Sequence, residues 1–233
     1  PETRGVNGVR ATNFQSETAL IEGWLVPAKK GSAMIFGIRG EMLIEDIEAG
    51  VVFQYHPESD LENLPGFDQE MIQMGYHLKG ESELGFWNES RLDIEMKPSA
   101  PMQFDTVLGI DYTFDIGEGL HVLMEYFLTT RQREFSLTDL KGHRTYQQIG
   151  ISFDQPVGID LKWQLFGLYD LRDESFQWIP QIEYALTDSL FLYAHGRVGG
   201  SLKKGKKDGR LFRKTDEFNG TEPAVGITLV NYF

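Results

Sequence analysis

Two histidines, His121 and His195, are the residues of this sequence best suited to acid–base or metal chemistry near neutral pH. Neither has a second histidine at the HxxxH spacing of a zinc site, and neither lies in a nucleophile-elbow motif. A hydrolase would also need a Ser or Asp nucleophile beside one of them, and we cannot assemble such a pair. We therefore predict no enzymatic activity, no metal and no cofactor, and we interpret both histidines as lining residues of a polar surface.

A second set of chemically active side chains recurs at every other position, as Glu89, Arg91, Asp93 and Glu95. A spacing of two places all four charges on one face of a β-strand. Such a face is either the solvated exterior of a soluble protein or the wall of a water-filled interior. The elements around it must decide between the two.

The composition of the 233-residue chain excludes several classes of protein. With 41% hydrophobic and 24% charged residues it resembles a soluble protein, and no apolar run approaches the roughly 18 residues of a membrane helix. The alternating strands of a membrane β-barrel, however, dilute the apolar signal. The formal net charge of −13 argues against a nucleic-acid partner, and the absence of cysteine excludes disulfides and thiolate metal sites.

The segment 103–130 gives the clearest structural signal. Apolar side chains alternate with Asp105 and Asp111 in the run 103–114, and with His121 and Glu125 in the run 120–130. Both runs are about as long as a tilted strand that crosses a bilayer, roughly 9–11 residues, whereas globular strands average about 5–6. The intervening DIGEG, residues 115–119, predicts a turn. We therefore predict a hairpin of a transmembrane β-barrel.

The same alternation along the rest of the chain predicts an all-β protein with a single domain, residues 1–233, and no helix. Thirteen strands are expected, at 8–14, 18–26, 33–40, 50–56, 71–79, 84–96, 103–114, 120–130, 146–153, 158–169, 176–186, 190–198 and 224–233. The segment 41–49 is interpreted as an extension of the third strand followed by a turn near Glu45 and Asp46. Because proline removes a ladder hydrogen bond, we expect a bulge or a local defect at Pro180.

The predicted connections fall into two sets that alternate along the chain. One set contains every long loop: 27–32, 57–70, 97–101, 131–145, 171–174 and 200–223. The other contains only tight turns: 15–17, 45–49, 80–83, 115–119, 154–157 and 187–189. Long extracellular loops and short periplasmic turns are typical of an outer-membrane barrel.

The C-terminal run AVGITLVNYF resembles the closing strand of Gram-negative outer-membrane β-barrels, which ends in phenylalanine and is recognised by the barrel-assembly machinery. Ile227, Leu229 and Phe233 match its alternating apolar pattern, and Gly226 matches its usual glycine. Asn231 departs from the pattern at a position where an aromatic or apolar residue is common. VLGIDYTF and GLHVLMEYFL likewise resemble porin-type strands. The resemblance implies a porin-like protein of the bacterial outer membrane, surrounded by its lipid and lipopolysaccharide.

A soluble β-sandwich or lipocalin-like barrel is the main alternative, because it produces the same alternation with the two faces exchanged. Its strands would be shorter, and it would have no reason to place every long loop on one side. The transmembrane antiparallel up-and-down barrel is therefore the preferred fold.

The strand number raises a problem of parity, because single-chain bacterial barrels have an even number of strands. We expect about 12–14 strands in this chain, with one misassigned near 8–14 or 41–49, or a barrel completed by strands from elsewhere. The second explanation is preferred. The further strands would come from a preceding part of the chain or from another polypeptide that completes or plugs the barrel.

The expected function is that of a porin-like channel, or the barrel of a transport assembly, through which small polar solutes diffuse passively. Because acids outnumber bases among the inward-facing residues, we predict a weak preference for cations. The expected lumen-lining residues are Glu89, Arg91, Asp93, Glu95, Asp105, Asp111, His121, Glu125, Asp160, Lys162, Glu183, His195 and Arg197.

A basic cluster occupies the last long loop and consists of Lys203, Lys204, Lys206, Lys207, Arg210, Arg213 and Lys214. It could bind a phosphate-rich ligand, but a solvated extracellular loop attracted to anionic lipopolysaccharide is the preferred interpretation. A different class of function is also open at this point. The chain could form a structural barrel that conducts nothing and binds a partner through the loops 57–70, 131–145 and 200–223.

Overall fold

The computed structural model describes residues 8–27, 34–57, 70–96, 102–132, 145–202 and 222–232, the side chains of residues 131 and 132 excepted. They form thirteen strands: β1 (Val9–Ser16), β2 (Ala19–Pro27), β3 (Met34–Ile44), β4 (Ile47–His56), β5 (Met71–Gly80), β6 (Gly85–Glu95), β7 (Met102–Phe114), β8 (Leu120–Gln132), β9 (Thr145–Val157), β10 (Leu161–Asp170), β11 (Ser175–Ala185), β12 (Leu190–Ser201) and β13 (Ala224–Asn231). The predicted number of strands is confirmed, as is the hairpin of β7 and β8.

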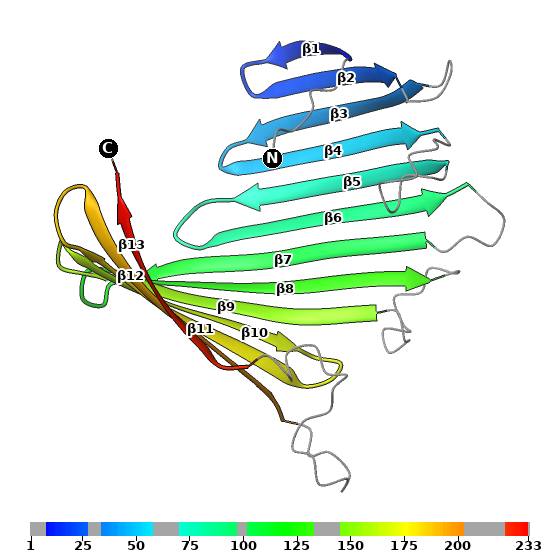
Figure 1. Ribbon diagram of the computed structural model, residues 1–233. Helices are drawn as coiled ribbons and strands as arrows, with labels where there is room; N and C mark the ends of the chain where they lie inside the picture. Colours follow the sequence, from blue (N-terminus) through cyan, green and yellow to red (C-terminus); the bar gives the residue numbers. More distant parts are fainter. Residues whose placement is uncertain are drawn as a thin grey trace, which may run out of the picture. The chain divides into compact units, whose positions relative to one another are not determined.

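The strands form a single antiparallel sheet in which every strand pairs with its neighbours in the sequence, in the order β1 to β13 (Figure 1). This up-and-down order confirms the all-β, antiparallel part of the predicted fold. The sheet is not closed within the described residues, where β1 and β13 are its two edges. Its closure and its passage through a membrane are therefore not shown by the fold.

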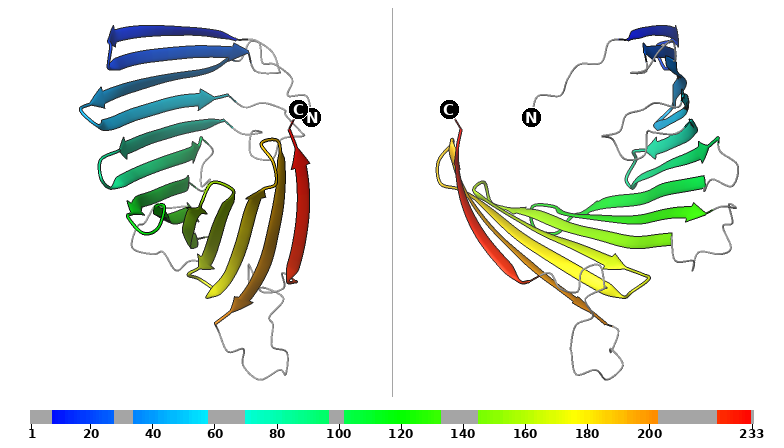
Figure 2. Two further views of the ribbon diagram at one scale, coloured as in Figure 1. Left: turned by 90° about the vertical axis from the view of Figure 1, so that its left-hand side faces the viewer. Right: turned by 45° about the vertical axis from the view of Figure 1, so that its right-hand side comes forward.

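The chain divides into two compact units, each described here by itself. Unit 1 comprises Pro1–Ser82, Phe86–Val107 and Leu128–Thr145, and unit 2 comprises Glu83–Gly85, Leu108–Phe127 and Tyr146–Phe233. Figure 2 shows their strands from two further directions. The strands β7 and β8 contribute one end to each unit.

The connections between the strands alternate in length as predicted. Residues 17–18, 45–46, 81–84, 115–119, 158–160 and 186–189 join strands at one set of ends, which we call the tight-turn ends. Residues 28–33, 57–70, 96–101, 133–144, 171–174 and 202–223 join them at the opposite set, which we call the long-connection ends. Every connection longer than five residues therefore belongs to the second set.

In unit 1 the cross-strand partners define a charged face. Glu22 pairs with Arg39, Arg39 with Val52, Val52 with Gly75, and Gly75 with Arg91. Residues directly opposite each other in a ladder point to the same side of the sheet. The other side is the apolar face of unit 1, and it carries Ile21, Ile38, Val51, Phe53, Met74 and Leu92.

Unit 2 has the same two-sided pattern. Asp154 pairs with Gln164, Gln164 with Gln181, and Gln181 with His195, which places these residues on the charged face of unit 2. The next row of partners lies on the opposite, apolar face and consists of Trp163, Ile182, Ala194 and Ile227.

Neither apolar face is covered by a second layer of described residues. Val51 is 64% exposed, Leu108 49% and Ile227 73%. Met71 and Leu128 are the only buried hydrophobic side chains in the described part of the chain. A soluble sandwich or lipocalin would bury such side chains in a core, and no core of this kind is formed by the described strands.

Several glycines make room for an aromatic ring on the neighbouring strand. The Trp24 ring occupies the space that a Cβ atom of Gly37 would take, and the Trp178 ring does the same at Gly167. On the charged face of unit 2, the His195 ring covers Gly226 in the same way. Glycine is required at these positions because any side chain would displace the ring.

Two local features differ from the prediction or refine it. The turn expected at 154–157 is wrong, because β9 continues to Val157 and the chain turns at 158–160. Gly158 adopts a φ of 66°, a conformation that glycine takes at little cost, and the turn forms around it. At Pro180 there is a local defect rather than a bulge. Pairing with β12 is interrupted at this residue and the one before it, while the register on either side is unchanged.

Candidate functional site

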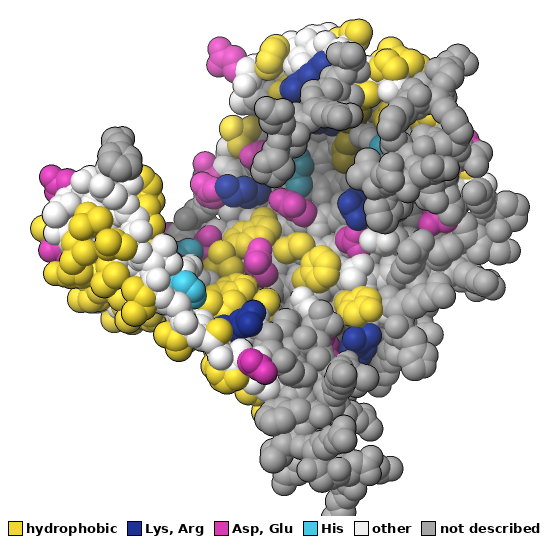
Figure 3. All heavy atoms as spheres, in the orientation of Figure 1, with side chains coloured by type: hydrophobic (Ala, Val, Ile, Leu, Met, Phe, Trp, Pro, Cys, Tyr) yellow, Lys and Arg dark blue, Asp and Glu magenta, His cyan; other side chains and the backbone are white. Residues whose placement is uncertain are grey.

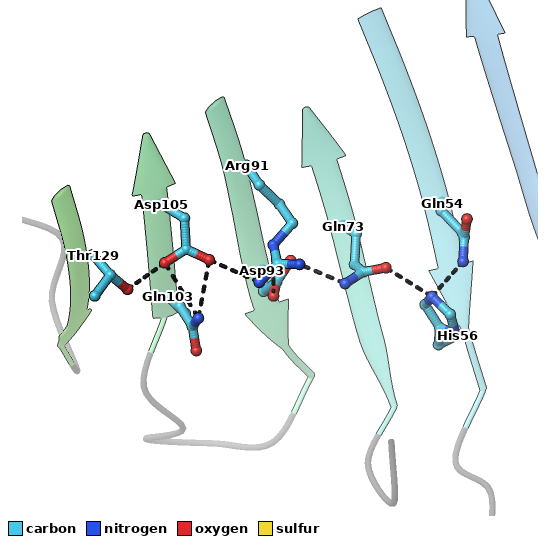
Figure 4. Close-up of polar contacts among 8 residues, drawn as sticks. All are labelled: Gln54, His56, Gln73, Arg91, Asp93, Gln103, Asp105 and Thr129. Carbon is cyan, nitrogen blue, oxygen red and sulfur yellow. Dashed lines mark hydrogen bonds and ion pairs between the residues drawn. The ribbon is translucent and has the colours of Figure 1, made fainter. Parts of the chain in front are cut away.

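The charged face of unit 1 carries a continuous chain of side-chain contacts across five neighbouring strands, β4 to β8 (Figure 4). We call it the hydrogen-bonded belt. Its members are Gln54, His56, Gln73, Arg91, Asp93, Gln103, Asp105 and Thr129.

Asp105 on β7 is the acceptor at one end of the belt. Arg91 Nη2 donates to its Oδ2 at 2.7 Å, Gln103 Nε2 donates to the same oxygen at 3.0 Å, and the Thr129 hydroxyl donates to Oδ1. Charge-assisted hydrogen bonds of this kind are stronger than neutral ones. Three strands, β6, β7 and β8, are thereby tied together through one carboxylate.

The belt continues from Arg91 towards β4. Arg91 Nε lies 3.4 Å from Asp93 Oδ2, and Gln73 Nε2 donates to Asp93 Oδ1 at 3.1 Å. Gln73 Oε1 lies 2.8 Å from His56 Nε2, which also contacts Gln54. Because His56 ends β4 and Gln73 lies near the start of β5, this part of the belt lies at the long-connection ends.

A second cluster on the same face centres on Glu22, which is 5% exposed. Glu22 accepts hydrogen bonds from Arg10 and from the Thr12 hydroxyl, and Arg39 Nε lies 3.3 Å from its Oε1. Arg39 Nη1 also forms an ion pair with Glu41 at 3.0 Å. A buried carboxylate needs such partners, because an unpaired buried charge is costly.

Near the tight-turn ends of β4 and β5 the ion pairs are more exposed. His77 Nε2 lies 3.3 Å from Glu48 Oε1. In the following turn, a hydrogen bond from Lys79 lowers the pKa of the Glu81 carboxyl. Exposed pairs of this kind contribute little to stability.

A hollow of about 940 Å³, which we call the trough, lies between the hydrogen-bonded belt and the cluster around Glu22, which we call the Glu22 cluster. Its lining includes Trp24, Arg39, Gln54, Gln73 and Arg91. Small-molecule sites commonly have volumes of about 300–1,000 Å³. Figure 3 shows that Lys, Arg, Asp and Glu side chains lie among hydrophobic ones on the surface in view.

In unit 2 a smaller cluster, which we call the His121 cluster, lies near the tight-turn ends of β7 to β10. His121 Nδ1 lies 2.9 Å from Asp154 Oδ1, and its Nε2 lies 3.7 Å from Asp111 Oδ2. Lys162 Nζ lies 3.0 Å from Asp154 Oδ2. In the part of the chain that the structure describes, no group of three or more His, Cys, Asp and Glu side chains could hold a metal ion.

The structure brings together six of the predicted lining residues. Three belong to the hydrogen-bonded belt and three to the His121 cluster: Arg91, Asp93, Asp105, Asp111, His121 and Lys162. Of the others, Glu89, Glu125 and Arg197 lie within strands and form no ion pair with any described residue. Glu95 ends β6 opposite Met71.

Glu183 pairs with Lys162 across the ladder, and His195 covers Gly226. The prediction that Asp160 lies in a strand is wrong. It lies in the turn after Gly158, because β9 extends past the expected turn. In the predicted assembly signal, Gly226, Ile227 and Leu229 lie in β13. Phe233 and the basic cluster 203–214 lie outside the described residues.

Sequence reasoning missed several residues of these clusters, namely Arg10, Glu22, Arg39, Glu41, Gln54, His56, Gln73, Gln103, Thr129 and Asp154. Alternation within residues 34–44 places Arg39 and Glu41 on one face, but residues 19–27 are apolar on both sides and give no signal for Glu22. Asp154 would have been found if Gly158 had been recognised as the turn residue.

The described residues include no helix that is long and apolar enough to span a membrane. Comparison of the chain with protein-family models, with curated proteins and with solved structures finds no match.

Proposed function

We propose that this protein is an outer-membrane β-barrel that works as a porin-like channel, or as the barrel of a transport assembly, for small polar solutes. The observation that carries the proposal is the two-sided sheet. Thirteen antiparallel strands follow one another in sequence order, with one face charged and hydrogen-bonded and the other apolar and uncovered. In a membrane the apolar face would meet lipid and the charged face would line a water-filled lumen.

The lengths of the strands support this proposal. β1 and β13 have 8 residues, and the other strands have 9 to 13. A tilted strand needs roughly 9–11 residues to cross a bilayer. Strands of this length are unusual in globular proteins, where the average is about 5–6.

Aromatic residues near the strand ends of the apolar faces give further support. At the long-connection ends of unit 1, the rings of Phe36 and Tyr55 lie 5.3 Å apart. At the tight-turn end of β7, the rings of Tyr112 and Phe114 lie 4.8 Å apart. Outer-membrane barrels carry girdles of aromatic residues at both membrane–water interfaces.

An open sheet would be costly in lipid, because unpaired backbone groups there cost several kcal/mol each. The proposed barrel therefore requires that both edges of the sheet, β1 and β13, be paired in the membrane. Since neighbouring strands are antiparallel, an odd number of added strands gives the even total of single-chain bacterial barrels.

Single-channel recording tests the conducting function. Purified protein added to a planar bilayer should give discrete openings, with a reversal potential that indicates a weak preference for cations. Clear anion selectivity would contradict the predicted lining. A folded, membrane-inserted protein that never opens would instead indicate a structural barrel that binds a partner through its long connections.

Thiol labelling in intact cells tests the orientation. Leu171→Cys places a thiol in the connection 171–174, and Glu118→Cys places one in the tight turn 115–119. A membrane-impermeant maleimide should label the first and not the second, although both should react after the outer membrane is permeabilised. Glu118 is chosen in preference to Gly117, whose φ of 64° would strain a cysteine. Equal labelling of both in intact cells would contradict the topology.

A further inference from the structure

The trough on the charged face of unit 1 has a regular arrangement that the proposed channel does not by itself explain. Arg39 and Arg91 belong to the same transverse row of partners, separated by Val52 and Gly75. Glu41 and Glu89 belong to the adjacent row. An Arg and a Glu thus lie side by side on β3 and again on β6, and the two on β3 form an ion pair. We call these two sets the Arg–Glu pairs. Three strand spacings separate the pairs, about 14 Å at roughly 4.8 Å per strand.

Four residues lie between these pairs: Val52, Gly75, Gly50 and His77. The first row contributes Val52 and Gly75, and the second contributes Gly50, which the His77 ring covers. The size of the hollow, about 940 Å³, leaves space for a solute of several rings.

A third row completes the trough with neutral hydrogen-bonding groups and a ring. Trp24 pairs with Gly37, Gly37 with Gln54, and Gln54 with Gln73. The Trp24 ring lies over Gly37 on the sheet and also lines the trough. The two amides add both donors and acceptors, since each has an NH₂ group and a carbonyl oxygen.

The two arginines of the trough, Arg39 and Arg91, are paired with carboxylates of the protein. Arg39 contacts Glu22 and Glu41, at 3.3 and 3.0 Å. Arg91 contacts Asp93 and Asp105, at 3.4 and 2.7 Å. Each guanidinium therefore lies between two carboxylates, and it keeps directional N–H groups without offering a free positive charge to an anion.

This chemistry fits a neutral solute rich in hydroxyl groups. A hydroxyl both donates and accepts, so it can bridge a carboxylate and a guanidinium or amide that are already paired with each other. The C–H face of a sugar ring packs against an aromatic face such as that of Trp24. An anion would have to displace a carboxylate from Arg39 or Arg91, and a purely apolar solute would leave polar groups without partners.

We propose that the trough is a binding site for a neutral polyhydroxylated solute of the oligosaccharide class. The inference rests on the proposed channel function and names the class of solute that passes through it. The site would slow and select such solutes on their way along the charged face of unit 1.

Two independent measurements with maltotriose as the probe test this inference. Calorimetric titration of the folded protein in detergent should show saturable binding, and the same sugar should interrupt the current through open channels at matching concentrations. Polyethylene glycol of equal size should do neither, because it lacks hydroxyl donors along its length. Arginine hydrochloride should bind more weakly than the sugar.

Trp24→Ala should weaken maltotriose binding roughly tenfold, through loss of the stacking face. Trp178→Ala is the matched control, because Trp178 covers Gly167 on the apolar face of unit 2. It should leave sugar binding unchanged. If Trp24→Ala does not fold, the double variant Gln54→Ala and Gln73→Ala serves instead. It removes two amides from the trough, leaves the Trp24 ring over Gly37, and should also weaken maltotriose binding.

The outcomes separate this inference from the proposed function. Channels that open normally but neither bind maltotriose nor respond to it would overturn the site and leave the channel function intact. Tighter binding of arginine or of inorganic phosphate than of maltotriose would show an ionic site and also overturn it. Sugar binding that depends on Trp24, in a protein without openings, would support the site and contradict the channel.

Discussion

The charged faces of the two units use their polar residues differently. In unit 1, Arg39 and Arg91 each contact two carboxylates, and the hydrogen-bonded belt joins five neighbouring strands. In unit 2 the ion pairs that the structure describes between strand residues form the His121 cluster near the tight-turn ends. Phe166, Leu168 and Ile179 occupy the middle of the same face.

This difference shows that strand periodicity and site chemistry are separate properties. Both units obey the same period of two, so both present one polar and one apolar face. In unit 1 complementary side chains on successive strands form both the hydrogen-bonded belt and the Glu22 cluster, whereas in unit 2 they form the smaller His121 cluster. We therefore expect changes on the charged face of unit 1 to have larger effects than equivalent changes in unit 2.

The largest difference is expected between Asp105→Ala and Asp154→Ala. Asp105 accepts from Arg91, Gln103 and Thr129, so its removal leaves three donors without their acceptor and should lower the free energy of unfolding by about 2–3 kcal/mol. Asp154 contacts only His121 and the half-exposed Lys162 among these groups, so Asp154→Ala should lower the free energy of unfolding by about 1–2 kcal/mol. Urea unfolding from lipid vesicles measures both.

Asn variants at the same two positions provide the control, because the amide oxygen still accepts one hydrogen bond and keeps the volume. Asp105→Asn should recover part of the loss. Equal destabilisation by Asp105→Ala and Asp154→Ala would show that the belt stabilises the sheet no more than the His121 cluster does.

The two units should respond equally to changes at a feature that both contain, a glycine covered by a tryptophan ring. Gly37→Ala and Gly167→Ala each place a methyl group where a tryptophan ring lies, so each should destabilise the protein by about 1–3 kcal/mol. Gly40→Ala is the control, since a Cβ there would meet no atom within 4 Å. Thermal unfolding followed by the heat-dependent shift in gel mobility is a suitable measurement. A marked difference between the two tryptophan sites would indicate that the units differ in packing as well as in charge.

A smaller effect is expected on ion selectivity. Glu89 lines the trough and forms no ion pair with the described residues, so Glu89→Gln should move the cation-to-anion permeability ratio towards one. Glu125 in unit 2 is likewise without a described ion pair, and Glu125→Gln should have a smaller effect because the trough lies in unit 1. Reversal potentials in a salt gradient measure both ratios. A larger change in the permeability ratio for Glu125→Gln than for Glu89→Gln would show that unit 2 has the greater influence on ion selectivity.

The sequence predicted the order, number and two-sidedness of the strands because these depend on local alternation. It did not predict the belt, for two physical reasons. Gln54, Gln73 and Gln103 are neutral, so a search for charged residues passes over them. The partners of Gln73 are also set by the cross-strand register, because His56 and Asp93 lie 17 and 20 positions away in the sequence.

The Glu22 cluster was missed for a related reason. Glu22 is the only charged residue in β2, and its partners Arg10 and Arg39 belong to separate strands. No spacing within one segment reveals such a set. A single misplaced turn had a similar consequence in unit 2, where the expected turn at 154–157 concealed Asp154 and assigned Asp160 to the lining.

The smallest effect is expected from removing the charge of Asp160, which the sequence analysis assigned to the lining in place of Asp154. Asp160 lies in the tight turn 158–160, where its carboxylate has no described ion pair, whereas Asp154 contacts His121 and Lys162 within the sheet. Asp160→Asn should therefore change neither the permeability ratio nor the stability, while Asp154→Asn, with the same loss of charge, should lower the stability measurably. Since exposed turn charges contribute little, a shift in reversal potential for Asp160→Asn would show that this turn borders the conducting path. The original assignment of Asp160 to the lining would then be restored.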